Sequence, residues 1–194
     1  MQPGEALNAL TENNMNQTSA SKIVEKLETP AMQIHMASVP VNSVDSPTRI
    51  SRAQLWQALK IWGRGDARFV PPFVESKIVE ESADQIVKDI LHYGKSNMAD
   101  GSPNLQRTSF RGDNLMVTEY LGGPWFMAIA GIEERDNGEI CLQLTTLRHK
   151  QHPDYVSPAE LARKAGSDKL PPTIEQNVNR LIGIIRKLAE NNEV

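Results

Sequence analysis

TIEQNVNRLIGIIRKLA, residues 173–189, is the stretch that decides the fold class, because it predicts one long amphipathic helix. Thr173 and Gln176 form a capping box, in which the hydroxyl and the amide satisfy free backbone groups of the first turn. The apolar positions then recur at helical spacing: Ile174, Val178, Leu181, Ile182, Ile185 and Leu188. A helix with a single apolar stripe needs a partner surface, which the rest of the chain has to supply.

Residues 75–150 predict that surface as a series of antiparallel strands. Strands bounded by turn residues are expected at 78–81, 86–93, 105–110, 115–121, 125–133 and 139–148. The sequences Arg111-Gly112-Asp113-Asn114 and Asp136-Asn137-Gly138 indicate hairpin turns between neighbouring strands. Upstream, a strand is expected around residues 34–41, and Ser51 begins a helix through a second capping box.

These elements predict an α+β fold in which a curved antiparallel sheet wraps around the long C-terminal helix. An antiparallel sheet with one covered face cannot bury that face alone. A sheet that curves over one helix often leaves a cavity between the two, which suits an apolar ligand. We therefore expect a small hydrophobic metabolite as the partner.

The composition of the 194-residue chain excludes several other classes of partner. Its net charge is −3 and its aromatic fraction is 5%, so we expect no nucleic acid as a partner. No run of about 18 apolar residues is present, so no membrane span is expected. The amino terminus lacks the pattern of a secretory signal, and the single Cys141 fits a reducing compartment. These features predict a cytoplasmic protein.

The chain changes in character near residue 32. The segment Asn8 to Ser21 is polar and has too few apolar positions to offset the entropy of ordering it. We expect residues 1–31 to form a flexible N-terminal extension and residues 32–194 to form one ligand-binding domain.

Five motifs of that domain resemble a known family: MQIH (32–35), VPVN (39–42), SRAQLW (51–56), FVP (69–71) and IIRKLA (184–189). They look like the corresponding motifs of the AtaL-like proteins, named for the acetylaranotin biosynthesis protein L, of the SRPBCC or START-like superfamily. The resemblance implies a helix-grip fold with a hydrophobic pocket and, in fungal members, an association with secondary-metabolite gene clusters. It implies no catalytic residue, because the family has no agreed catalytic motif.

The sequence lacks the common signatures of catalytic and metal sites. It has no phosphate-binding glycine loop and no Gly-x-Ser-x-Gly motif. His149 and His152 stand without further ligands, and Cys141 lies in an apolar strand, where a buried inert thiol is expected. We therefore expect neither a metal nor a cofactor.

Strand alternation then selects candidate catalytic residues. The more apolar face of residues 115–121 contains Glu119, which is therefore predicted to face the cavity, where desolvation would raise its pKa. Arg148 shares the apolar face of residues 139–148 and is a possible partner for Glu119 or for an oxyanion of the ligand. The alternative is a plain structural ion pair between them.

The same reasoning selects candidate ligand-binding residues and leaves one strand open. In residues 86–93, either Lys88 and His92 or Asp89 and Tyr93 point inward, and the periodicity does not decide between them. The candidate ligand-binding set is Tyr93, Arg107, Val117, Trp125, Met127, Leu144 and Thr146.

The functional hypothesis is a cofactor-free cyclase or isomerase that confines a hydrophobic secondary-metabolite intermediate in a reactive conformation. A non-catalytic carrier of an apolar metabolite is the alternative. A third possibility is an interaction module whose extension docks on a partner or on the second copy of a homodimer.

Overall fold

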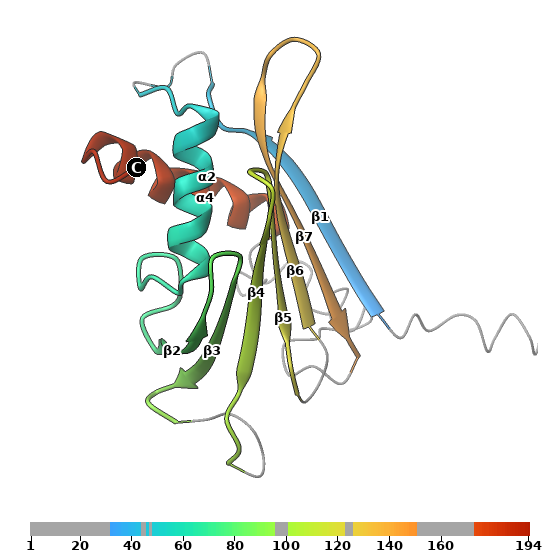
Figure 1. The fold of residues 1–194 in the computed structure, drawn as a ribbon. Coiled ribbons are helices and arrows are strands. Elements are labelled where there is room, and N and C mark those ends of the chain that lie inside the picture. Colours follow the sequence, from blue (N-terminus) through green and yellow to red (C-terminus); the bar gives the residue numbers. More distant parts are fainter. Residues whose placement is uncertain (1–31, 44–45, 47, 96–100, 123–125, 151–172) are drawn as a thin grey trace, which may run out of the picture. The chain divides into compact units, whose positions relative to one another are not determined.

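We describe a computed structural model of the chain (Figure 1). It describes residues 32–43, 46, 48–95, 101–122, 126–150 and 173–194. The expected extension over residues 1–31 and the candidate residue Trp125 lie outside the described residues.

The strands form one seven-stranded antiparallel sheet with the order β1-β7-β6-β5-β4-β3-β2 (Figure 1). Strands β2 to β7 follow one another across the sheet, and β1 returns to pair with β7. The bounds are β1 Met32–Pro40, β2 Val74–Glu81, β3 Gln85–His92, β4 Leu105–Arg111, β5 Leu115–Tyr120, β6 Phe126–Glu134 and β7 Ile140–His149. The predicted hairpin turns therefore connect β4 to β5 and β6 to β7.

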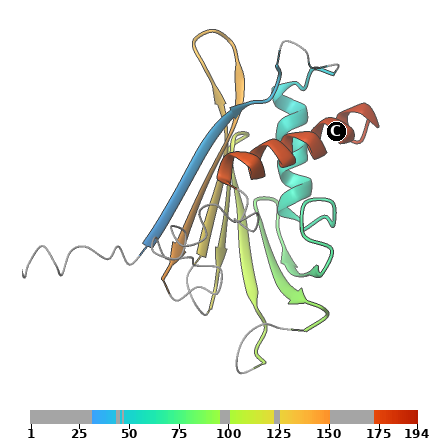
Figure 2. The same ribbon diagram turned by 180° about the vertical axis from the view of Figure 1, so that it is seen from behind.

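Two helices of the described chain, α2 (Arg52–Gly63) and α4 (Ile174–Glu190), lie against the same face of the sheet (Figures 1 and 2). Ser51 caps α2 and Thr173 caps α4, and both capping boxes are complete. The sequence-based expectation of two capped helices at these places is confirmed. The curved sheet with its long C-terminal helix confirms the predicted α+β helix-grip architecture.

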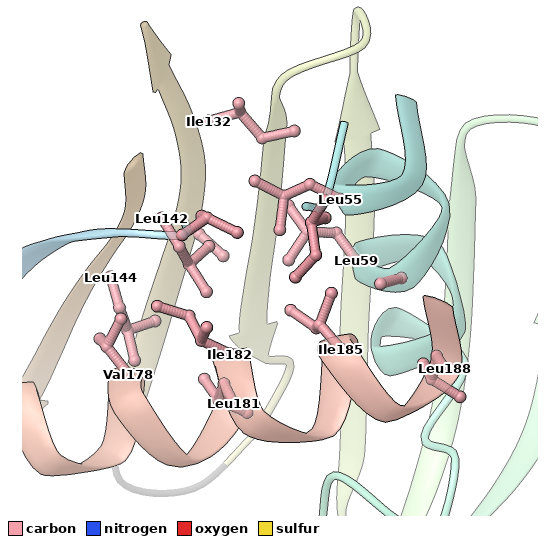
Figure 3. Packing of buried hydrophobic residues seen from close by; sticks show 14 of the residues in the cluster. Leu55, Leu59, Ile132, Leu142, Leu144, Val178, Leu181, Ile182, Ile185 and Leu188 are labelled. Atoms are coloured by element: carbon pink, nitrogen blue, oxygen red, sulfur yellow. The ribbon is translucent and has the colours of Figure 1, made fainter. Parts of the chain in front are cut away.

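The hydrophobic core joins α4, α2 and the sheet (Figure 3). Ile182 of α4 points toward Leu142 of β7, and Ile185 of α4 points toward Leu55 and Leu59 of α2 (Figure 3). Each of these side chains is at most 5% exposed. Burial of a side chain of this size stabilises a fold by about 1.5–3 kcal/mol, so the apolar stripe of α4 holds this helix on the sheet.

The register defines which residues share the inner face of the sheet, which is the face toward the helices. Leu142 and Leu144 of β7 lie opposite Ile132 and Ala130 of β6. The pairing continues through Met116 of β5 and the inner positions of β4 to β3. Strand residues alternate between faces. The inner set on strands β3 to β6 is therefore Ile86, Lys88, Ile90, His92, Gln106, Thr108, Phe110, Met116, Thr118, Tyr120, Phe126, Ala128, Ala130 and Ile132.

Candidate functional site

A cavity of about 410 Å³ lies between the inner face of the sheet and the end of α2. Its lining residues are Trp62, Gly63, Val70, Pro71, Phe73, Val74, Ser76, Lys88, Ile90, His92, Gln106, Met116, Thr118, Tyr120, Phe126 and Ala128. The described lining contains no α4 residue, so the cavity lies beside α2 and not where the sequence suggested, between the sheet and the terminal helix. It also contains no Asp or Glu.

A second hollow of about 420 Å³ lies near the start of α2 and the turn between β6 and β7. It is lined mainly by polar side chains and backbone, including Asn42, Arg49, Ser51 and Asn137. Because an apolar ligand needs an apolar wall with few polar groups, the cavity that contains Lys88 is the candidate site.

Lys88 is the most unusual residue of the cavity. Its side chain lies on the inner face of β3, the residue is only 5% exposed, and Nζ donates a 2.8 Å hydrogen bond to the carbonyl oxygen of Gly63. Burial lowers the pKa of Lys88 to about 8, because removal from water disfavours the charged form. At pH 7 about one-tenth of the amine is therefore uncharged.

Ser76 brings a hydroxyl to the same part of the cavity. Its Oγ is buried and has no hydrogen-bond partner in the described structure. A Cβ on Gly65, which has a φ of +84°, would lie 2.4 Å from Ser76 Oγ and 3.5 Å from Lys88 Cδ. The turn after α2 thus packs against both side chains and holds them together. A ligand oxygen between them would give the Ser76 hydroxyl a partner and accept a further N–H of Lys88.

Aromatic rings form the remaining walls. The rings of Tyr120 and Phe126 meet edge to face with centroids 5.6 Å apart, and the ring centroids of Phe73 and His92 are 6.2 Å apart. Rings in such positions offer large apolar surfaces to a planar or folded hydrophobic molecule. The cavity therefore combines an apolar wall with a small polar group built from Lys88 and Ser76.

The predicted inward orientation of Glu119 is wrong. Its neighbours Thr118 and Tyr120 line the cavity, so Glu119 lies on the opposite, outer face of β5. There it accepts a 2.7 Å hydrogen bond from Nε of Arg107, the residue across from it on β4. The prediction took the more apolar face of the strand as the inner one. In the structure the inner face carries the polar Thr118 and Tyr120, and the aliphatic Leu115 and Val117 lie on the outer face.

The same error moved three candidate ligand-binding residues to the wrong face. Arg107, Val117 and Met127 all lie on the outer face, opposite or beside Glu119. Tyr93 also lies outside the lining: it is 79% exposed and stacks on Phe73 with centroids 5.1 Å apart. These four residues therefore do not line the cavity.

The orientation predicted for β7 is confirmed. Leu144, Thr146 and Arg148 lie on its inner face, although none of them belongs to the described lining of the cavity. Leu144 is part of the hydrophobic core. Arg148 and Glu119 occupy opposite faces of the sheet, so the ion pair proposed between them does not form.

Of the two alternatives left open in residues 86–93, the structure selects Lys88 and His92 as the inward pair. Sequence reasoning missed Ser76, Gln106, Tyr120 and Phe126. The turn Arg111-Gly112-Asp113-Asn114 was a usable signal, since a hairpin there pairs Phe110 with Met116. Placing the large Phe110 inward would have placed Thr118 and Tyr120 inward as well.

Cys141 is fully buried as expected, and burial raises the pKa of its thiol.

Fold and site together define the class: a helix-grip domain with an apolar cavity between its sheet and a helix. The chain matches the AtaL family, described as acetylaranotin biosynthesis cluster protein L, over residues 35–192, and therefore belongs to that family. The predicted resemblance is confirmed. None of the curated protein sequences compared with the chain matches it.

Solved structures with a similar fold include several biosynthetic proteins. The di-domain ARO/CYC StfQ of the steffimycin pathway matches with a TM-score of 0.51 and 11% identity over 99% of this chain and 62% of that protein. The Zhui aromatase/cyclase from Streptomyces sp. R1128 matches with a TM-score of 0.48 and 16% identity over 84% of this chain and 95% of that protein. Norcoclaurine synthase from Thalictrum flavum matches with a TM-score of 0.49 and 9% identity over 82% of this chain and 87% of that protein. At such identities the likeness concerns the fold.

None of the described helices is both long and apolar enough to cross a membrane. Within the same residues, no three His, Cys, Asp or Glu side chains gather as metal ligands would.

Proposed function

We propose that this protein is a cofactor-independent cyclase or isomerase that acts on a hydrophobic secondary-metabolite intermediate bound in the cavity. The observation that carries the proposal is the buried amine of Lys88 in a cavity wall without a described carboxylate. An amine with a pKa of about 8 exchanges protons near neutral pH, which is the property required of a general acid or base.

The chemistry that fits this site is proton removal next to a carbonyl group. The uncharged amine of Lys88 takes a proton from the α-carbon of the ligand, and the electron pair of the C–H bond forms an enolate. The resulting ammonium and the Ser76 hydroxyl stabilise the enolate oxygen by charge and hydrogen bonding. Lys88 then lies where both the carbon and the oxygen of the reacting group are within reach.

Two outcomes follow from one enolate. If the ligand carries a C=C bond next to that α-carbon, the electron pair extends over it, Lys88 returns the proton to its far carbon, and the net reaction is an isomerisation by double-bond shift. If the enolate carbon attacks a second carbonyl of the same molecule, a C–C bond closes a ring, and Lys88 gives its proton to the new alkoxide. The aromatic walls favour the second outcome by holding a folded conformation and excluding water.

Membership of the AtaL family and the fold shared with the StfQ protein support a role in secondary metabolism. The competing proposal is a carrier that only binds an apolar metabolite. The mostly apolar lining favours it, because a carrier needs only such a wall and one orienting polar group.

The test uses 2-acetonaphthone, an aromatic methyl ketone, as a probe for proton abstraction. In D₂O, NMR measures how fast the methyl protons of the ketone exchange for deuterium. We expect the wild-type protein to accelerate exchange and Lys88→Met to lose about 10²-fold or more of that acceleration. Lys77→Met is the matched control, because Lys77 is exposed on the outer face of β2.

The probe separates the two proposals. Binding of the ketone without any acceleration of exchange would favour the carrier. Acceleration that persists unchanged in Lys88→Met would remove Lys88 from the mechanism. Native mass spectrometry of the purified protein then identifies any metabolite that co-purifies and provides a natural substrate or product for the assay.

A further inference from the structure

Arg148 is an inner-face cation for which the described residues provide no carboxylate partner. It is half-buried on β7, its Nε is shielded from solvent, and that atom makes no hydrogen bond. Among the described residues, no carboxylate forms an ion pair with its guanidinium. A buried donor without an acceptor is costly, so the arrangement requires a reason.

Arg148 is not one of the described lining residues of the cavity, but it lies next to one of them. Its Cζ lies 5.7 Å from the centroid of the Phe126 ring, and Phe126 lines the cavity. On the other side, β1 places Gln33 opposite Arg148 and His35 opposite Thr146. Burial, together with the charge of Arg148, lowers the pKa of His35, and an imidazole side chain supplies no negative charge to pair with Arg148.

Arg148 and Lys88 lie at the two ends of one row across the inner face. The register pairs Lys88 with Gln106 and Gln106 with Tyr120. The ring of Tyr120 contacts Phe126, and Phe126 pairs with Arg148. Neighbouring strands are about 4.8 Å apart, so four steps separate the two Cα atoms by about 19 Å along the sheet. This row contains a cation at each end and no acidic residue.

We infer that Arg148 binds a carboxylate group of the ligand, and that the substrate class is therefore an apolar carboxylic acid. The inference rests on the proposed function, because it takes the cavity to be the ligand site. Because Nε is shielded from solvent, the outer Nη–H groups of the guanidinium are the donors available to a ligand, and together they match the two oxygens of one carboxylate. The carboxylate then anchors one end of the ligand, and Lys88 meets a carbonyl group nearer the other end.

The test is a displacement assay in which the uncharged fluorescent probe N-phenyl-1-naphthylamine occupies the cavity. Two competitors differ only in charge: 4-(2-naphthyl)butanoate and its primary amide. For the wild-type protein, we expect the acid to bind about tenfold or more tightly than the amide, since hydrogen bonds to charged groups are the strong ones.

Arg148→Met is expected to abolish the preference for the acid while the Kd of the amide changes less than about twofold. Arg111→Met, which removes an exposed arginine at the end of β4, is the matched control and keeps the preference. A structural role for Arg148 predicts a lower melting temperature for Arg148→Met, whereas a binding role predicts an unchanged or higher one. If that variant does not fold, Arg148→Gln is measured in its place.

The following results would overturn the inference. The wild-type protein could show no preference for the acid, or the preference could persist in Arg148→Met. The preference could instead vanish in Lys88→Met and persist in Arg148→Met, which would assign the carboxylate to Lys88 and leave the proposed function intact. If neither the probe nor the competitors bind the wild-type protein, the cavity is not a ligand site, and the proposed function fails as well.

Discussion

Replacing Lys88 with Met should make the protein more stable at neutral pH, although it removes the proposed catalytic group. Burial holds the pKa of Lys88 at about 8, against 10.5 for a lysine in water. Each pKa unit corresponds to about 1.4 kcal/mol, so keeping the charged form buried costs about 3 kcal/mol at pH 7. Loss of the hydrogen bond to Gly63 offsets about 1 kcal/mol of this gain.

The sign of the pH dependence follows from proton counting. Between pH 8 and 10.5 the unfolded chain carries a proton on Lys88 that the folded chain has released. Stability contributed by this residue therefore rises with pH in that window and is lowest below pH 8. His92 and Tyr120 are the other titratable side chains in the described lining.

Urea unfolding followed by tryptophan fluorescence measures the effect at pH 7 and pH 9.5. We expect the free energy of unfolding of Lys88→Met to exceed that of the wild type by about 2 kcal/mol at pH 7. The difference should shrink at pH 9.5, because the wild type gains stability there. A variant that is less stable than the wild type at pH 7, with the same dependence on pH, would refute the reasoning.

Three further predictions follow from packing and charge. Gly65→Ala should lower stability by about 2 kcal/mol or more, because φ is +84° and the new Cβ would meet Ser76 at 2.4 Å; thermal unfolding measures this. Ile185→Ala should cost about 2–5 kcal/mol in urea unfolding, since Ile185 is fully buried, whereas Ile34→Ala, at a site that is 64% exposed, should change stability by less than about 0.5 kcal/mol. Glu119→Gln should leave deuterium exchange of the ketone probe unchanged and cost at most about 1 kcal/mol, because its ion pair lies on the outer face with side chains 25% and 41% exposed; lost exchange activity would contradict this placement.

Local signals predicted the elements well because their physical causes are local. The capping box at Thr173 and the apolar stripe that follows place the long helix within a residue or two of its observed bounds. The hairpin turn at Asp136-Asn137-Gly138 places the ends of β6 and β7. Neither signal requires knowledge of what lies across the fold.

Local sequence signals did not predict which face of β5 points toward the helices. Its alternating residues are Leu115, Val117 and Glu119 on one face and Met116, Thr118 and Tyr120 on the other, so both faces are partly apolar. A one-residue change of phase exchanges the two sets completely. Hydrophobicity favoured the face with two aliphatic residues, whereas the helices cover the other.

The sequence by itself determined the helices, the strands, the hairpins and the AtaL family, since caps, turns and periodicity act within short segments. Only the tertiary structure decided which face of each strand lines the cavity, and so exchanged Glu119 for Lys88 as the candidate acid or base. The physical reason is that burial is non-local: Lys88 is desolvated by α2 and its following turn, which lie far from it in the chain.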